Sequence, residues 1–203
     1  MARTCFTPRH AVVADEVVKN SAIFFDRDGV LAIPNFRDGR SFAALSLDEF
    51  QIYPEAFEAV RVAKRAGFLT IVVTNQPDVA SGKVPRAVVE TMHQVLRDLL
   101  AVDDIEVSFD PSGSDAPRRK PNPGMILDAA EKWSISLASS FVIGDRSSDL
   151  EAASRVGCKS VFIDRGYVAD PAPLIYSYKA LDVLDAVMWC VDSGGVLQNA
   201  ECV

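Results

Sequence analysis

Short apolar runs alternate with longer amphipathic stretches along most of the chain. Each run ends at a glycine, a proline or a polar turn. Runs of this kind are typical of strands that are buried on both faces of a parallel sheet. The pattern predicts five strands, over residues 22–26, 68–73, 105–109, 140–143 and 159–163.

The stretches between these runs carry apolar residues at helical spacing. Pro54 suits the first turn of a helix, because an N–H group at that position would have no partner within the helix. We predict helices over residues 54–66, 85–100, 124–133, 148–156 and 181–190. Their expected core positions include Phe57, Val60 and Ala63 in the first helix, and Val88, Val89, Met92, Val95, Leu96 and Leu99 in the second.

Alternating strands and helices predict an α/β fold, a doubly wound parallel sheet within one domain over residues 21–192. Residues 1–20 are expected to form an N-terminal arm, with a candidate edge strand at residues 11–13, and residues 193–203 a frayed C-terminal tail. The connection over residues 29–53 is longer than an ordinary loop, so we expect it to be functional or to form a small lid.

Composition narrows the class of protein. The chain has 203 residues, of which 49% are hydrophobic, and no apolar run is long enough to span a bilayer. Residues 1–20 lack the apolar segment of a signal peptide, so we expect a cytoplasmic location. The net charge of −7 argues against non-specific binding of nucleic acid, although a local pocket can still bind a small anion. We expect a monomer that binds neither nucleic acid nor a membrane.

The four cysteines are scattered along the chain and form no C-x-x-C pair. A disulfide framework or a cysteine-based zinc site is therefore disfavoured, and free thiols in a reducing compartment are the better interpretation. The four residues are Cys5, Cys158, Cys190 and Cys202.

Polar side chains stand where the predicted strands end. Because the carboxyl ends of parallel strands meet at one edge of a sheet, these side chains should lie together. The set consists of Asp26 and Asp28, then Thr74 and Asn75, then Lys120 in a strand-to-helix loop, and finally Asp145 and Asp149.

These residue types suit the hydrolysis of a phosphate monoester. Asp26 is placed to attack phosphorus and divide the reaction into two steps through an acyl phosphate. Asp28, two residues later, can protonate the leaving oxygen and then activate water. A Mg²⁺ ion prefers oxygen ligands, and the carboxylates of Asp26 and Asp145 with the backbone carbonyl of Asp28 could hold it. Thr74, Asn75 and Lys120 could hold the phosphoryl oxygens.

The motifs resemble those of the haloacid dehalogenase (HAD) superfamily of phosphatases. The matching segments are Phe24–Val30, Val73–Gln76, Arg119–Met125 and Ile143–Asp149. The sequences Asp-Arg-Asp-Gly, Thr-Asn-Gln and Arg-Lys-Pro-x-Pro-Gly-Met are similar to those of the essentially capless branch that contains D,D-heptose 1,7-bisphosphate phosphatases and histidinol phosphatases. The resemblance covers residues 22–191.

The resemblance implies a role for each matching residue. Asp26 would be the nucleophile and Asp28 the acid and base, and both would hold Mg²⁺ together with Asp145. Thr74, Asn75 and Lys120 would bind phosphate, and Asp149 would orient Lys120 or a metal-bound water. Arg119 and Arg146 would face the sugar or second phosphate of a small phosphorylated metabolite.

The chain departs from this pattern at a structural zinc site. Many members of the branch bind Zn²⁺ through a Cys-x-His pair and a Cys-x-Cys pair, where this chain has Ser108, Asp110, Ala116 and Arg118. None of these is a soft ligand, so we expect no zinc. Four prolines and an ion pair between Asp110 and Arg118 are expected to hold the loop instead.

The leading hypothesis is therefore a phosphatase that removes the 7-phosphate of a heptose 1,7-bisphosphate for the synthesis of nucleotide-activated heptose. Alternatives are a histidinol-phosphate phosphatase, another small sugar-phosphate phosphatase and a non-catalytic phospho-acceptor module. A module that only stores phosphate would not need Asp28.

We expect His93 to be structural or exposed and Trp133 to pack at a helix end.

Overall fold

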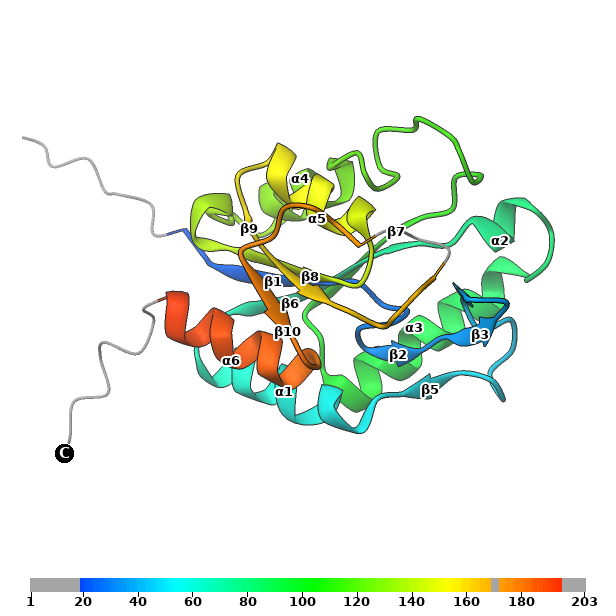
Figure 1. Cartoon of the computed structure of the whole chain (residues 1–203), viewed down its shortest axis with the longest axis horizontal. Helices are drawn as coiled ribbons and strands as arrows, with labels where there is room; N and C mark the ends of the chain where they lie inside the picture. Colours follow the sequence, from blue (N-terminus) through cyan, green and yellow to red (C-terminus); the bar gives the residue numbers. More distant parts are fainter. Residues whose placement is uncertain (1–18, 169–171, 195–203) are drawn as a thin grey trace, which may run out of the picture.

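A six-stranded parallel sheet forms the centre of the protein in the computed structural model, which describes residues 19–168 and 172–194. The strand order is β10-β9-β8-β1-β6-β7 (Figure 1). The central strand β1 pairs in parallel with both β6 and β8. The strands are β1 (Ala22–Phe25), β6 (Leu69–Asn75), β7 (Asp104–Ser108), β8 (Phe141–Gly144), β9 (Lys159–Ile163) and β10 (Tyr178–Ala180).

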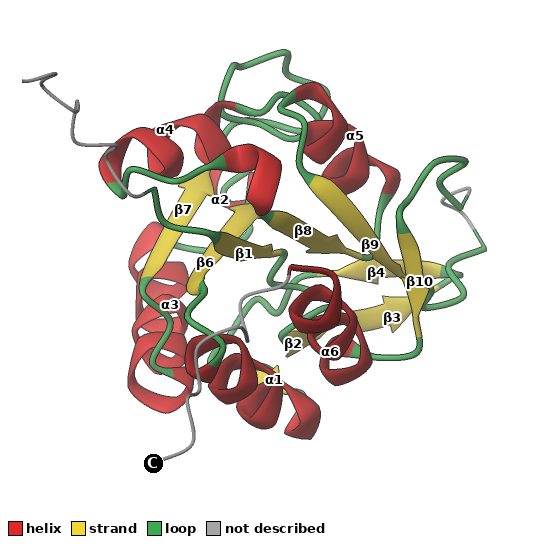
Figure 2. Ribbon diagram, turned by 90° about the vertical axis from the view of Figure 1, so that its left-hand side faces the viewer, coloured by secondary structure: helices red, strands yellow, loops and turns green. Residues whose placement is uncertain are grey.

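Helices cover both faces of the sheet (Figures 1 and 2). Helices α1 (Pro54–Arg65), α3 (Arg86–Leu100) and α6 (Val183–Gly194) pack on one face. Helices α4 (Gly124–Lys132) and α5 (Ser147–Arg155) pack on the other. Two short helical segments, α2 (Pro77–Ala80) and η1 (Leu137–Ser139), complete the helices of the described chain.

The side chains of β1 show why helices cover both faces of the sheet. Ile23 and Phe25 belong to the core cluster that contains α1, α3 and α6, whereas Ala22 and Phe24 belong to the cluster that contains α4 and α5. All four are fully buried. Because successive side chains of a strand point to opposite faces, an unbroken apolar run requires cover on both sides. The predicted doubly wound α/β fold is confirmed.

The five predicted strands and five predicted helices are all present, with ends shifted by only a few residues. Outside the 29–53 connection, three elements were not predicted, namely the edge strand β10, the single-turn helix α2 and the 3-10 turn η1. All three are too short to show a hydrophobic period. The 29–53 connection also contains strands, which pair as two small antiparallel ladders. They are β2 (Ala32–Ile33) with β5 (Gln51–Ile52), and β3 (Asn35–Arg37) with β4 (Arg40–Phe42).

Two expected core residues are wrong, because Phe57 of α1 is 45% exposed and Leu99 of α3 is 56% exposed. In α1 the buried side is instead formed by Ala56, Ala59 and Ala63 together with Val60. Small side chains let this helix approach α6 and the sheet closely, so the large aromatic ring lies outside the contact.

Some predictions fall on residues that the structure does not describe. The N-terminal arm up to residue 18, the candidate strand at residues 11–13 and the tail from residue 195 lie outside the described ranges. Cys158 and Cys190 are buried free thiols, and the other two cysteines lie outside the description. Within residues 19–168 and 172–194, no helix combines the length and apolar character needed to cross a bilayer.

We predict that Phe141→Ala lowers the free energy of unfolding by about 3–5 kcal/mol. Phe141 is 1% exposed and makes edge-to-face contacts with Phe68 and Trp189, at centroid distances of 5.8 and 5.9 Å. Phe57→Ala, an identical truncation at the exposed position, should change the free energy of unfolding by less than about 1 kcal/mol. Denaturant unfolding of the two variants checks this prediction, and equal losses of stability in both would contradict the assigned core.

Candidate functional site

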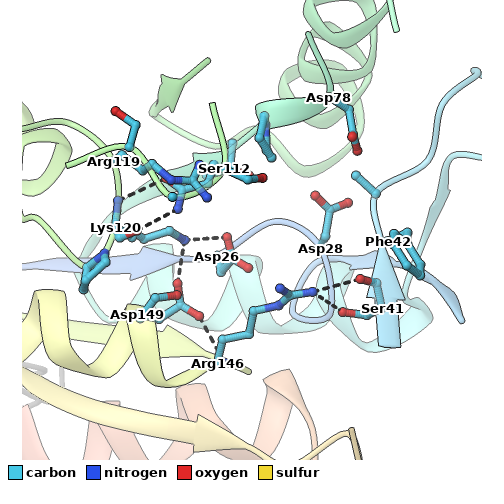
Figure 3. A pocket seen from close by; sticks show the side chains of 18 of the residues that line it. Asp26, Asp28, Ser41, Phe42, Asp78, Ser112, Arg119, Lys120, Arg146 and Asp149 are labelled. Atoms are coloured by element: carbon cyan, nitrogen blue, oxygen red, sulfur yellow. Dashed lines mark hydrogen bonds and ion pairs between the residues drawn. The ribbon is translucent and has the colours of Figure 1, made fainter. Parts of the chain in front are cut away.

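The carboxyl ends of β1, β6 and β8 surround a cavity of about 800 Å³. Strand order reverses around β1, and open α/β sheets form their binding crevice at such a point. Figure 3 shows the side chains that project into this cavity. Its lining includes eight of the predicted site residues, namely Asp26, Asp28, Thr74, Asn75, Arg119, Lys120, Arg146 and Asp149.

Lys120 lies at the base of the cavity, with only 4% of its surface exposed. Its Nζ lies 2.6 Å from Asp26 Oδ1 and 2.6 Å from Asp149 Oδ1 (Figure 3). It also donates to the carbonyl oxygen of Val73 at 2.7 Å. Burial by itself would lower the pKa of the ammonium, but the carboxylates of Asp149 and Asp26 outweigh it and hold this pKa above its ordinary value. Lys120 is therefore a fixed cation beside Asp26.

Three carboxylates lie close together beside Lys120, which contacts two of them, Asp26 and Asp149. Oxygen atoms of Asp26, Asp145 and Asp149 all lie within 4.8 Å of one another. Burial is the main reason that the pKa of Asp26 rises to about 6 and that of Asp145 rises well above its ordinary value, and the neighbouring carboxylates raise both further. The cations of Lys120 and Arg146 lower these pKa values only in part, so three ionised carboxylates would leave an excess of negative charge in a buried place.

The donor set fits a divalent cation. Asp145 Oδ1 is buried and has no hydrogen-bond partner among the described residues, as a carboxylate oxygen kept for a metal would. Both oxygens of Asp149 are engaged, by Lys120 Nζ and by the backbone N–H of Arg146 at 3.1 Å. Asp26 and Asp145 could therefore hold a divalent cation, while Asp149 holds Lys120. Asp28, the third expected metal ligand, is not part of this cluster of carboxylate oxygens.

Asp28 is supported from the side of the protein interior. Arg27, which is fully buried, donates to Asp28 Oδ2 from Nε at 3.0 Å and from Nη2 at 2.7 Å. Gln76 Nε2 donates to the same oxygen at 2.8 Å. Asp28 Oδ1 has no hydrogen-bond partner within the described ranges. The carboxylate is thus anchored through one oxygen only.

Thr74 and Asn75 end strand β6 at the cavity. Asn75 was expected to contact phosphate. It lines the cavity, and its side-chain amide also contacts the backbone of Lys120. Asn75 Nδ2 donates to the Lys120 carbonyl at 3.0 Å, and the Lys120 N–H donates to Asn75 Oδ1 at 3.1 Å. These two bonds join the loop that carries Lys120 to the end of β6.

The two predicted arginines lie on the cavity wall. Arg119 donates from Nη1 to the carbonyl oxygen of Asp110 at 3.2 Å. Arg146 donates from Nη2 to the carbonyl oxygen of Ser41 at 2.9 Å and also bonds its hydroxyl, which ties the β3–β4 hairpin to the start of α5. Its guanidinium also lies 5.9 Å from the ring centre of Tyr167.

Two glycines allow the acidic residues to approach one another. A Cβ atom on Gly29 would lie 1.9 Å from Asp145 Oδ2, and the φ of +91° at this position strongly favours glycine. A Cβ atom on Gly144 would lie 2.3 Å from the Cβ of Asp149. A larger residue at either position would move a carboxylate away from the site.

Sequence reasoning gave no role to four residues that contact the site. Arg27 and Gln76 bond Asp28, His93 lies behind Arg27, and the Tyr167 hydroxyl donates to Asp145 Oδ2 at 2.6 Å. Two of them had a signal in the sequence, because Gln76 directly follows Thr74 and Asn75, and Arg27 lies between Asp26 and Asp28. His93 was expected to be structural or exposed, and it is 3% exposed.

The loop before Lys120 differs from the expectation. The predicted ion pair between Asp110 and Arg118 is wrong, because Arg118 pairs with Glu106, at 2.6 Å, and with Asp128. Asp110 Oδ2 instead accepts a hydrogen bond from Ser108 Oγ at 2.7 Å. Arg118 thereby joins β7 to α4, partners that the sequence spacing did not indicate.

We predict that Asp26→Asn stabilises the chelator-treated protein at about pH 8 by roughly 1–3 kcal/mol. The pKa of Asp26 is raised in the folded state to about 6. Its favourable contribution to the free energy of unfolding is therefore present below about pH 4, where the carboxyl is protonated, and is lost as the pH rises through about 6. Denaturant unfolding should show the two proteins converging near pH 4.

Asp103→Asn is the matched control, with the opposite sign. Partial burial alone would raise the pKa of Asp103, but hydrogen bonds from Lys64 and Thr70 lower it. The contribution of the Asp103 carboxylate to the free energy of unfolding is present above its pKa in the unfolded chain and is lost as the pH falls. This variant should therefore be less stable than the unmodified chain near pH 8. Destabilisation by both variants at that pH would contradict the charge assignment.

Comparisons with known proteins agree with this geometry. A family model described as HAD-hydrolase-like matches residues 117–187. Over 154 residues the chain is 35% identical to the D-glycero-beta-D-manno-heptose-1,7-bisphosphate 7-phosphatase of Pseudomonas aeruginosa, with 73% of this chain and 84% of the relative covered. The D-glycero-alpha-D-manno-heptose-1,7-bisphosphate 7-phosphatase of Burkholderia mallei is 32% identical, with coverages of 69% and 77%.

A solved structure shows the same fold. The D,D-heptose 1,7-bisphosphate phosphatase from B. bronchiseptica, complexed with magnesium and phosphate, is 25% identical with a TM-score of 0.73. The alignment covers 85% of this chain and 99% of that one. With more than two thirds of both sequences shared at over 30% identity with the curated relatives, the chain belongs to the heptose-bisphosphate phosphatase family of HAD-like hydrolases.

Proposed function

We propose that the chain is a Mg²⁺-dependent phosphomonoesterase that acts through an aspartyl phosphate on Asp26. The arrangement that carries the proposal is the Asp26 carboxylate, which lines the cavity 2.6 Å from the ammonium of Lys120 and beside the unpartnered oxygen of Asp145. A nucleophile, a fixed cation and a place for a divalent cation therefore lie together. When bound between Asp26 and Asp145, Mg²⁺ would neutralise the carboxylates and a phosphoryl oxygen.

In the first step, a carboxylate oxygen of Asp26 forms a bond to phosphorus and the bond from phosphorus to the ester oxygen breaks. Protonated Asp28 donates its proton to the departing alkoxide. The Lys120 ammonium and the Thr74 hydroxyl stabilise charge on the phosphoryl oxygens. The products are an alcohol and an acyl phosphate on Asp26.

In the second step, ionised Asp28 accepts a proton from water as the water oxygen attacks phosphorus. The bond between phosphorus and Asp26 breaks, which restores the carboxylate and releases inorganic phosphate. Asp28 ends protonated, ready for another cycle. The use of Asp28 in both steps distinguishes this function from that of a phospho-acceptor module.

The proposed substrate is D-glycero-D-manno-heptose 1,7-bisphosphate, with loss of the 7-phosphate. The names of the relatives from Pseudomonas aeruginosa and Burkholderia mallei support this substrate, and one is named for the beta anomer and the other for the alpha anomer. A cavity of about 800 Å³ falls within the usual range for small-molecule sites. Cationic side chains on its wall would suit the second phosphate, and they belong to Arg40, Lys83, Arg119 and Arg146.

We also propose that the loop before Lys120 folds without zinc. Residues 104–124 contain no cysteine or histidine. Arg118, joined to Glu106 and Asp128, would link β7 to α4 in place of a metal. Metal analysis of the purified protein should find less than stoichiometric Zn²⁺, and one bound zinc per chain would overturn this part of the proposal.

Asp26→Asn should reduce phosphate release from the heptose bisphosphate by about 10⁴-fold or more, because the amide is a poor nucleophile. The assay needs Mg²⁺, with histidinol phosphate and a nucleoside monophosphate as comparison substrates. Product analysis should find heptose 1-phosphate. Equal turnover of all three compounds would contradict the substrate, and full activity of Asp26→Asn would contradict the mechanism.

A further inference from the structure

Gln76 contacts two functional groups without reaching the cavity itself. It is 1% exposed, and it is not part of the cavity lining although Thr74, Asn75 and Pro77 around it are. Its Nε2 donates to Asp28 Oδ2 at 2.8 Å and to Thr74 Oγ1 at 2.9 Å. One amide thus joins the turn after β1 to the end of β6.

The orientation of this amide follows from its partners. Arg27 can only donate hydrogen bonds, so the group that faces Arg27 Nη2 at 2.8 Å must be the oxygen of Gln76. An ionised carboxylate can only accept, so the amide nitrogen must face Asp28. Both hydrogens of Nε2 are then engaged, one on Asp28 and one on Thr74.

This orientation determines what Thr74 can do. Because Thr74 Oγ1 accepts a hydrogen bond from Gln76, the hydrogen of its hydroxyl is left to donate. Thr74 lines the cavity, where the proposed function places a phosphoryl oxygen that needs donors.

The same amide limits how Asp28 can exchange a proton. Oδ2 receives three N–H groups, two from Arg27 and one from Gln76. Proton exchange then falls to Oδ1, the oxygen without a partner among the described residues. A carboxylate held by one oxygen keeps the other in a constant direction for both steps of the reaction.

Arg27 is itself supported from behind. Its Nη1 lies 3.4 Å from His93 Nε2. Burial of the His93 ring and the nearby charge of Arg27 lower the pKa of His93 to about 3. The ring is therefore neutral and can accept from Arg27 through Nε2, with its own hydrogen on Nδ1. His93 thus contacts Arg27, Arg27 contacts Gln76, and Gln76 contacts the cavity residues Asp28 and Thr74.

We propose that Gln76, oriented by Arg27 and His93, is a positioning residue that makes Thr74 a hydrogen-bond donor to the substrate phosphate and leaves one oxygen of Asp28 for proton transfer. The inference rests on the proposed phosphatase function. It assigns a role to three buried residues that do not line the cavity.

The test replaces Gln76 with glutamate and, separately, with methionine. Gln76→Glu keeps the shape and the contact with Arg27 but loses the two amide hydrogens, and Gln76→Met keeps the length without polar atoms. Each variant is assayed with Mg²⁺ on an alkyl phosphate, whose leaving group needs a proton, and on p-nitrophenyl phosphate, whose leaving group does not. Calorimetry with inorganic phosphate reports on Thr74.

For both variants, kcat/KM should fall on the order of 10²-fold on the alkyl phosphate but only about tenfold on the aryl phosphate. Affinity for inorganic phosphate should fall by about tenfold. The ratio of the two activities is measured within one sample, so partial unfolding does not change it. Gln94→Glu, the same change on the exposed face of α3, should leave both activities within about twofold.

Equal losses on both substrates with unchanged phosphate binding would overturn the inference, because a purely structural residue would affect both substrates alike. Full activity of either variant would overturn it as well. Failure of the proposed function would look different, since the unmodified chain would then release phosphate from neither ester. The phosphate-binding comparison would still decide whether Gln76 orients Thr74.

Discussion

The charge balance around Lys120 is the constraint on which this edge of the sheet depends. The buried ammonium of Lys120 contacts the carboxylates of Asp26 and Asp149, and the carboxylate of Asp145 lies beside them. Burial raises the pKa of Asp26 and of Asp145, and the cations of Lys120 and Arg146 offset this only in part. A divalent cation would restore the balance, and under the proposed function it would leave Asp26 to act as the nucleophile. The repulsion that we expect to make the metal-free protein less stable near neutral pH would also favour cation binding.

This concentration of charge is possible because of the sheet beneath it. Strand β1 lies between β6 and β8, so the carboxyl ends of three strands lie side by side while their apolar runs are covered on both faces. Gly29 and Gly144 then remove the side chains that would hold Asp145 and Asp149 away. The apolar core provides the stability from which an acidic, strained edge can be supported.

Polar side chains hold the predicted site residues in position. Asn75 fixes the backbone of Lys120, Gln76 connects Asp28 with Thr74, and the Tyr167 hydroxyl bonds Asp145. Gln76 is buried, and both of its amide hydrogens and its oxygen have partners, as a buried polar group requires. The geometry of the cavity therefore depends in part on a side chain that does not line it.

The amino-acid sequence by itself determined the strand and helix periods, and through them the doubly wound fold and the edge at which the acidic residues gather. Local pattern suffices there, because the burial of a strand or helix face repeats at a short period. Only the tertiary structure decided that Phe57 is exposed, that Arg118 pairs with Glu106 and Asp128, and that Gln76 contacts Asp28. These outcomes depend on how closely helices approach and on contacts between distant segments, such as Gln76 with Asp28, which no local spacing encodes. For the same reason the residue types could indicate a phosphate site, whereas the hydrogen bonds that give each side chain its direction had to be read from the packed structure.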